Sequence, residues 1–309
     1  MNADFASRLT ERIKLLRNPS VMGLDPQLAY LPPECMKNSG IRSMEDAAAA
    51  ILGFNRALLT ACRDIIPAVK FQMACYEQFG AAGWDCLYQS VQFAKEMGYL
   101  SICDGKRNDI GSTAETYARA ILGKTELASG CVRAALNADA VTINPYLGSD
   151  GVEPFLAYCR EEGKGVFILL RTSNPSSVEI QNLELKDGRR LYEAIADLIS
   201  AWSETVPHTG DYSPVGAVVG ATWPEEARAL RKRLPNQYFL IPGYGAQGGK
   251  AEAAVAGFDH LHGGGIVNAS RSLMLAWKKE AYRGLSFAEA TKEEAIEMRD
   301  LLQKALQNA

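Results

Sequence analysis

The sequence predicts an α/β protein, a single-domain (β/α)8 TIM barrel, and three observations lead to this. Short apolar runs alternate with longer stretches of helical pattern along the chain. Eight such runs can be counted, and several are almost continuously apolar, as parallel strands covered on both faces should be. A length of 309 residues suits one barrel of this kind. We expect one domain over residues 1–309, with a core over about 18–280 and a C-terminal helix over about 286–308.

Each predicted strand is an apolar run that ends in polar or turn residues. The runs lie at Val21–Asp25, Ala68–Gln72, Leu100–Lys106, Ala140–Asn144, Val166–Thr172, Gly216–Ala221, Tyr238–Pro242 and Gly265–Ala269. The alternative is an open doubly wound sheet. That fold favours a glycine-rich turn after its first strand, and the residues that follow here, Pro26 and Gln27, do not form one.

The segments between the runs are predicted to be helical. They lie at Ala47–Ile65, Glu77–Met97, Thr113–Leu136, Val152–Glu162, Leu191–Thr205, Glu225–Arg233 and Gly249–Ala256, with a closing helix at Phe287–Gln307. Met1 to Leu16 mixes polar and charged residues, which indicates a short surface helix and not a secretory signal. The connections 26–44 and 174–190 are long, and the second is a candidate lid.

The amino-acid composition argues against several classes of function. The net charge of −3 argues against a nucleic-acid partner, and no run of about 18 apolar residues could span a membrane. The seven cysteines are scattered, without a CxxC pair, which predicts reduced thiols and a cytoplasmic protein. Neither the cysteines nor the three histidines have metal-ligand spacing, so we expect no metal site.

The third predicted strand ends in a dense group of charges. In a strand Asp104 and Lys106 point to the same face, so a carboxylate and an ammonium would stand together in the barrel mouth. Lys70 on the neighbouring strand offers a second cation, and Asp109 lies just beyond the strand end. Buried charges are costly unless they are paired. We therefore interpret these residues as one charged array; a solvated loop is the alternative, which the apolar lead-in 101–103 disfavours.

Such an array has a chemical use. Ammonium neighbours keep each carboxylate ionised, so a substrate carboxylate placed beside Asp104 would be repelled. Loss of carbon dioxide would relieve that repulsion. The carbanion left behind would meet Lys106, which could stabilise it and then donate a proton.

A second group of residues indicates a phosphate site. Glycines in Pro242–Gly249 would let backbone amides approach an anion, and the helix predicted next would present its N-terminus. Arg271, just past the eighth strand, could grip phosphate with two hydrogen bonds. Phosphate sites after strands 7 and 8 are common in barrels. A flexible turn beside a surface arginine is the alternative.

Taken together, these residues resemble the orotidine 5′-monophosphate decarboxylase family, and more closely its longer bacterial subgroup. The resembling segments occur in the family's order from residue 23 to residue 271, so they cover most of the chain. They are Gly23-Leu24-Asp25-Pro26, Val69-Lys70-Phe71-Gln72, Asp104 to Thr113 with its DxKxxD pattern, Thr142 to Gly148, Thr172-Ser173-Asn174-Pro175, Pro242–Gly249 and Val267 to Arg271.

The resemblance implies a role for each matching charged residue. Asp25 is similar to the aspartate that contacts the ribose hydroxyls, and Lys70 to the lysine that joins the array and the ribose. Asp104 resembles the carboxylate that faces the substrate carboxylate. Lys106 resembles the lysine that donates a proton to C6 of the substrate's pyrimidine ring.

Further roles follow from the same resemblance. Asp109 and Thr113 are similar to residues that the family supplies to the neighbouring subunit's site, which implies a homodimer. Ser173 resembles the serine that reads the pyrimidine edge. The phosphate grip would come from Gln247, Gly248 and Arg271. The implied reaction forms uridine 5′-monophosphate from a small nucleotide substrate without any cofactor.

Two other functions stay open from the sequence. A magnesium-dependent sugar-phosphate decarboxylase or synthase on the same scaffold shares the DxKxxD pattern, and a metal requirement would favour it. A non-catalytic nucleotide-binding barrel would bind without turnover, although it should have lost part of the array. For Asn144 and Tyr146, at the fourth strand end, contact with ligand and support of the barrel are both possible.

Overall fold

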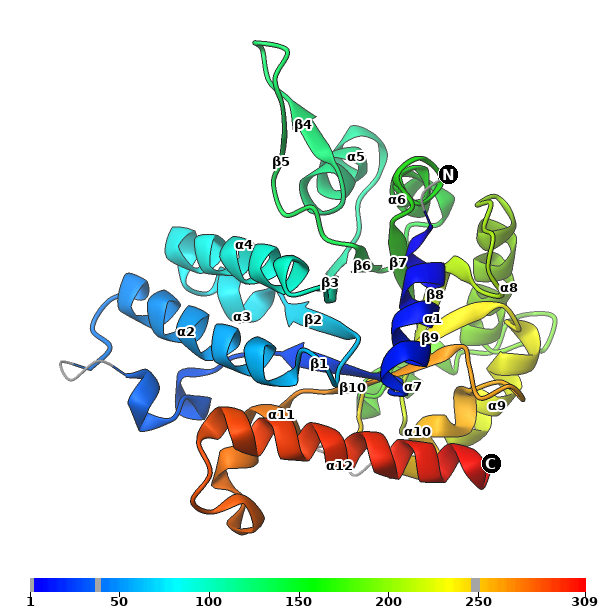
Figure 1. The fold of residues 1–309 in the computed structure, drawn as a ribbon. Helices are drawn as coiled ribbons and strands as arrows, with labels where there is room; N and C mark the ends of the chain where they lie inside the picture. Colours follow the sequence, from blue (N-terminus) through cyan, green and yellow to red (C-terminus); the bar gives the residue numbers. More distant parts are fainter. Residues whose placement is uncertain (1–2, 37–39, 246–250) are drawn as a thin grey trace.

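The structure is a computed structural model that describes residues 3–36, 40–245 and 251–309. Eight parallel strands close a barrel in the order β1-β10-β9-β8-β7-β6-β3-β2 (Figure 1). They are β1 (Ser20–Leu24), β2 (Ala68–Gln72), β3 (Leu100–Arg107), β6 (Ala140–Ile143), β7 (Gly165–Arg171), β8 (Ser213–Val219), β9 (Gln237–Ile241) and β10 (Gly265–Ala269). The predicted (β/α)8 barrel is confirmed, and each predicted run overlaps one of these strands.

Helices surround the barrel, and the longer ones turn their apolar faces toward its core. They are α2 (Met44–Cys62), α3 (Ala74–Glu77), α4 (Gly80–Glu96), α5 (Gly111–Ile121), α6 (Ser149–Glu162), α7 (Val178–Gln181), α8 (Leu191–Glu204), α9 (Pro224–Arg233), α10 (Ala251–Ala254), α11 (Arg271–Met274) and α12 (Phe287–Gln307). The closing helix α12 agrees with its predicted range. It begins at a capping box, in which the Ser286 hydroxyl accepts from the Glu289 amide and the Glu289 carboxylate accepts from the Ser286 amide.

The first helix, α1 (Phe5–Leu16), closes the amino-terminal end of the barrel. Asp4 caps it by accepting a hydrogen bond from the Ser7 amide at 2.8 Å. Phe5 and Leu9 are fully buried among side chains of the barrel interior, and the Phe5 ring packs edge-on against Phe167 at 5.8 Å. The predicted helix is therefore present, but only its outer face is exposed to solvent, and its inner face is buried in the barrel.

The predicted helix Thr113–Leu136 is wrong beyond Ile121. The chain instead forms an antiparallel hairpin of β4 (Lys124–Glu126) and β5 (Val132–Ala134), which stands away from the barrel beside α5 (Figure 1). Gly130 has φ of 72°, a conformation that glycine adopts without strain, and its amide donates to the Leu127 carbonyl to close the turn. This turn chemistry and the β-branched residues around it overcome the helical pattern.

Two more predicted helices differ from the structure. Glu77–Met97 is divided between the end of α3 and α4, and Gly80, the first residue of α4, takes φ of 58° at the break. Of Gly249–Ala256, only the four-residue α10 and a 3-10 turn at Val255–Gly257 form, while residues 249 and 250 lie outside the described part. The long connection 174–190 contains a 3-10 turn and α7. Within the described residues, no helix combines the length and the apolar character needed to cross a membrane.

Candidate active site

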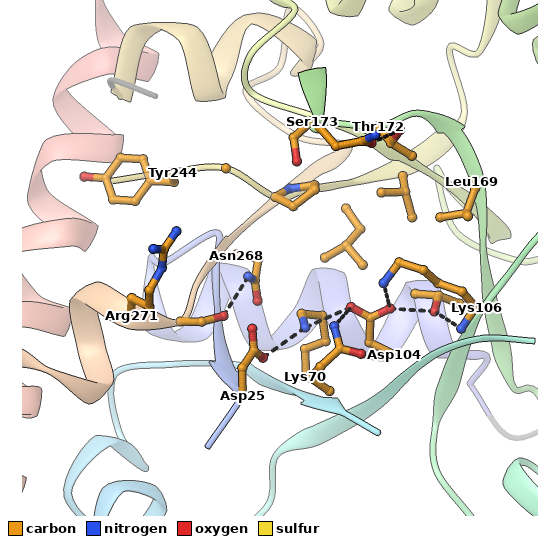
Figure 2. Close-up of a pocket in the computed structure, with 18 of the residues that line it drawn as sticks. Asp25, Lys70, Asp104, Lys106, Leu169, Thr172, Ser173, Tyr244, Asn268 and Arg271 are labelled. Atoms are coloured by element: carbon orange, nitrogen blue, oxygen red, sulfur yellow. Dashed lines mark hydrogen bonds and ion pairs between the residues drawn. The ribbon is translucent and has the colours of Figure 1, made fainter. Parts of the chain in front are cut away.

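A cavity of about 490 Å³ opens at the carboxyl-terminal mouth of the barrel (Figure 2). This volume is within the usual range for small-molecule sites. Its polar lining includes Asp25, Lys70, Gln72, Asp104, Lys106, Thr142, Thr172, Ser173, Asn174, Gln181, Tyr244, Asn268, Ser270 and Arg271. Leu169, Val218 and Leu240 form an apolar floor.

Three of the four residues of the predicted charged array, Lys70, Asp104 and Lys106, lie at the centre of the cavity, without Asp109. The Asp104 carboxylate lies between two ammonium groups, with Lys70 Nζ 2.9 Å from Oδ2 and Lys106 Nζ 2.6 Å from Oδ1. Lys70 also reaches Asp25 at 3.3 Å. Gln72 donates to Asp104 Oδ2 at 3.3 Å and the Thr142 hydroxyl donates to Oδ1 at 2.8 Å. Both oxygens of the carboxylate are thus held by two donors each, which fixes its orientation.

Charge pairing outweighs burial in this array. Burial alone would raise the pKa of Asp104, but Lys70 and Lys106 hold the pKa of that carboxyl well below its usual range. Burial would likewise lower the pKa of Lys70, and the Asp104 and Asp25 carboxylates raise it instead. Asp104 and Lys70 therefore both stay ionised at neutral pH. The side chain of Lys70 is 4% exposed, whereas that of Lys106 is 44% exposed and faces the cavity.

Asp25 lies where β1 meets β10. A side chain at Gly23 would collide with Ser270, because a Cβ there would lie 1.9 Å from the Ser270 hydroxyl. The missing side chain lets the two strand ends approach. Asn268 donates to the Ser270 hydroxyl at 3.1 Å, and within the described part of the chain its own Oδ1 is buried without a hydrogen-bond donor. Asn268 is one of the residues that line the cavity.

Ser173 lies on the opposite wall, after β7. The loop is organised by Gln181, whose side-chain oxygen accepts from the Thr172 amide at 3.1 Å and whose nitrogen donates to the Thr172 hydroxyl at 2.8 Å. The fully buried Arg171 guanidinium stacks on the Trp223 ring at 3.8 Å. Trp223 in turn donates from Nε1 to the Thr172 carbonyl at 2.8 Å. The wall that carries Ser173 is therefore held from behind by aromatic and amide contacts.

The predicted phosphate site is described only in part. Gly243, with φ of 98°, and Tyr244 line the cavity after β9, and Arg271 lines it at the start of α11. The predicted Gln247 and Gly248 lie outside the described residues. Of the helix predicted to present its N-terminus here, the described residues contain α10, and the predicted start at Gly249 lies outside them, so this part of the phosphate site stays a prediction.

Other predicted residues lie outside the cavity. Among the described residues, its lining includes neither Asp109, which accepts a hydrogen bond from the Ile110 amide, nor Thr113, which is exposed in the first turn of α5. Asn144 accepts from the Tyr146 amide at 3.0 Å, and Tyr146 is 81% exposed. For these last two residues the structure favours a loop-supporting role over contact with a ligand in the same chain.

Sequence reasoning did not assign Gln72, Thr142, Gln181 or Asn268 to the site. Gln72 and Asn268 are polar residues at strand ends, so their position was a usable signal. Thr142 alternates with apolar neighbours in β6, which also marks an inward side chain. Gln181 lies ten residues after the end of β7, and no local pattern points to it. No group of three or more His, Cys, Asp and Glu in the described ranges is arranged to hold a metal ion.

The closed parallel barrel and its charged cavity at the carboxyl ends of the strands define a (β/α)8-barrel enzyme. Residues 46–284 match the profile of the family described as "Orotidine 5'-phosphate decarboxylase / HUMPS family". The chain belongs to this family.

Individual relatives agree with this assignment. The orotidine 5′-phosphate decarboxylase of Rhodopirellula baltica is 39% identical over 278 residues, which are 90% of this chain and 90% of that protein. That of Clostridium acetobutylicum is 38% identical over 285 residues, 92% of this chain and 94% of that protein. The solved structure of Leishmania donovani OMP decarboxylase is similar with a TM-score of 0.73 and 32% identity, over 96% of this chain and 99% of that chain.

Proposed function

We propose that the buried array of Lys70, Asp104 and Lys106 carries the reaction that the family assigns to this chain. The chain decarboxylates orotidine 5′-monophosphate to uridine 5′-monophosphate and carbon dioxide, a step of pyrimidine biosynthesis. The supporting observation is a carboxylate clamped between two ammonium groups, one buried and one facing the cavity. In our proposal these side chains act without a cofactor.

The proposed reaction needs only the substrate, the Lys106 side chain and water. The bond between C6 and the carboxyl carbon breaks, carbon dioxide leaves, and the electron pair stays on C6. The Lys106 ammonium stabilises this charge and then transfers a proton to C6, so that a C6–H bond forms and a neutral amine remains. Water returns the proton to Lys106. Its partial exposure toward the cavity suits both transfers.

The repulsion that favours loss of carbon dioxide is local. Asp25, Lys70, Asp104 and Lys106 sum to no net charge, so the array as a whole does not reject an anion. Asp104 alone would repel a substrate carboxylate placed against it, by about 4 kcal/mol at 4 Å and an effective dielectric constant of about 20. Four donors hold the Asp104 carboxylate, so it cannot easily turn away.

The remaining side chains place the nucleotide in this proposal. Asp25, linked to Lys70, binds the ribose hydroxyls, and Ser173 on the opposite wall reads the pyrimidine edge. Arg271 grips the phosphate together with Gln247 and Gly248 of the loop that follows β9. The apolar floor between these groups excludes water from the reacting carbon.

We further propose that the active form is a homodimer in which Asp109 and Thr113 complete the partner subunit's site. Both residues lie outside the cavity of their own chain, as described above. The surface beside them is apolar: Ile110 is 53% exposed, and Tyr117 on α5 is 37% exposed. These features fit a face that a second copy covers.

The hairpin β4–β5 gives the dimer further support. It extends from the barrel beside α5, and Leu127 and Val132 on it are 47% and 48% exposed (Figure 1). An isolated two-stranded hairpin is at best marginally stable in water, so a partner that covers it would stabilise it. We also propose a cytoplasmic location, which the seven free cysteines fit, and one functional domain over residues 1–309.

The first test is the loss of orotidine 5′-monophosphate absorbance with purified protein in excess chelator. Rapid formation of uridine 5′-monophosphate is expected, because no step of the proposal uses a metal. Activity only on a sugar phosphate with magnesium would replace this proposal with the related magnesium-dependent enzyme. Uridine nucleotide binding without turnover on either substrate would make the chain a binding protein.

A further inference from the structure

The catalytic pair Asp104 and Lys106 lies in a distortion of the barrel between β3 and β6. Cys103 pairs with Val141 and Arg107 pairs with Ile143, so Asp104, Gly105 and Lys106 together oppose a single residue of β6, Thr142. Bulges of this kind bend a strand, leave ladder groups unpaired and redirect side chains beside active sites. Within this distortion the Lys106 ammonium reaches Asp104 Oδ1, only two residues away along the same strand.

Lys106 has a backbone conformation that is unusual for its residue type. Its φ is 48°, in the left-handed region that a lysine enters only at an energetic cost. Such a conformation persists only where the surroundings hold it. At this point the ordinary ladder bond is missing, and the Lys106 amide donates instead to the Thr142 hydroxyl at 3.0 Å.

The Thr142 hydroxyl both accepts and donates a hydrogen bond. It accepts from the Lys106 amide and donates to Asp104 Oδ1 at 2.8 Å. The directions are fixed, because an amide nitrogen can only donate and an ionised carboxylate can only accept. Thr142 is 1% exposed, so water cannot replace either contact. One side chain therefore ties the strained backbone of Lys106 to the carboxylate that its own ammonium contacts.

We propose that Thr142 is a positioning residue for decarboxylation, which holds Lys106 in its left-handed conformation and orients Asp104 against the substrate. This inference depends on the proposed function, since it assigns Lys106 and Asp104 to the chemistry. Without the hydroxyl, the Lys106 backbone relaxes and its ammonium moves away from the place where C6 would lie. Displacements of about 1 Å can cost about 100-fold in rate.

The test compares three variants. Thr142→Val keeps the volume and β-branching of the side chain and removes the hydroxyl, while Thr142→Ser keeps the hydroxyl. Thr291→Val is the matched control, because Thr291 on α12 is also fully buried, is not among the residues that line the cavity, and donates its hydroxyl to the Leu273 carbonyl on α11. Turnover of orotidine 5′-monophosphate, its KM, uridine 5′-monophosphate affinity and thermal unfolding are measured for each.

We expect Thr142→Val to lower kcat by about 10- to 100-fold, with KM and product affinity changed less than about threefold. Enzyme-catalysed exchange of the C6 hydrogen of uridine 5′-monophosphate in heavy water should slow by a similar factor, because it uses the same proton donor. Thr142→Ser should recover most of the activity, and Thr291→Val should keep it. Equal kcat in Thr142→Val and wild type, or a loss that thermal unfolding fully accounts for, would overturn the proposal.

Crystal structures of the variants give a readout that needs no activity. Lys106 should leave the left-handed region in Thr142→Val and keep it in Thr142→Ser. An unchanged Lys106 backbone in Thr142→Val would contradict the inference. If the wild-type protein did not decarboxylate the nucleotide at all, the proposed function would fail, while this structural comparison would still decide whether Thr142 holds Lys106.

Discussion

The two ends of the barrel both bury charged side chains, but they satisfy those charges in different ways. At the amino-terminal end, the guanidinium of Arg231 is 8% exposed and donates to five backbone carbonyls, including those of Gln237 and Gly264 at 2.8 Å and 2.6 Å. Burial lowers the pKa of Arg231 to about 10. At the carboxyl-terminal end, Lys106 reaches a single carboxylate and faces the open cavity.

The comparison shows what separates a structural charge from a reactive one. Arg231 uses most of its donors on backbone carbonyls at the starts of β9 and β10 and in the loops that precede them, where they hold the fold together. The Lys106 ammonium has three donors, of which Asp104 takes one, and the rest face space that a substrate can fill. In barrels the first end supports stability and the second supports catalysis. The predictions below test this division.

The largest expected effect is at the open end. Lys106→Ala should lower turnover of orotidine 5′-monophosphate by about 10⁴-fold or more, since it removes both proton donation and charge stabilisation. Uridine 5′-monophosphate binding and thermal unfolding should change little, because the Lys106 side chain is 44% exposed and does not pack in the hydrophobic core. Near-normal turnover would refute its role as proton donor.

The next effect depends on the proposed sharing of sites. Lys106→Ala and Asp109→Ala subunits, each inactive alone, should recover about a quarter of wild-type activity after random mixing. Half of the dimers would then contain both variants, and one of the two sites in each would be intact. Activity is measured after subunit exchange, and a mixed dimer is confirmed by mass. No recovery in a confirmed mixed dimer would mean that Asp109 serves its own chain.

At the closed end the expected effect is on stability. Arg231→Met should lower the free energy of unfolding by about 3 kcal/mol, because five backbone carbonyls, four of them in buried hydrogen bonds, lose their donor. The kcat/KM of the folded protein should stay within about twofold of wild type. Arg228→Met, on the same helix but in an exposed ion pair with Glu225, should cost less than about 1 kcal/mol in urea unfolding. A selective loss of kcat in Arg231→Met would break the division between the ends.

The smallest effect is a change in pH dependence. The pKa of Asp104 is depressed in the folded state from its ordinary value of 3.8, so its contribution to stability is present above that value and is lost as the pH falls. The wild-type protein should therefore lose its stability advantage over Asp104→Asn as the pH is lowered from about 5 toward 3. Urea unfolding of both proteins across this range measures the difference. A difference independent of pH would mean that Asp104 is not held ionised by its lysine neighbours.

The sequence predicts the barrel well because its strands are apolar runs with a fixed place in the order. It also predicts Lys70, Asp104 and Lys106 as neighbours, since period-two alternation and strand order determine which side chains meet. It does not predict the left-handed backbone of Lys106, which depends on a pairing between β3 and β6 that no local pattern contains. The helix prediction fails at residues 124–134 for a different reason. The turn residues there favour a hairpin, although the same segment also has a helical pattern.

Helix α1, which closes the amino-terminal end of the barrel, has a consequence for how the chain folds. This helix precedes every strand of the barrel along the chain, yet Phe5 and Leu9 dock among side chains that include Tyr212, Tyr238 and Ile266. The surface that receives them is complete only after most of the chain has left the ribosome. Contacts between such distant positions form slowly, and the apolar face of α1 stays uncovered in the meantime. A segment that is synthesised before the barrel strands is thus among the last to reach its native contacts, and we expect a chaperone that shields residues 5–9 during synthesis to raise the yield of folded enzyme.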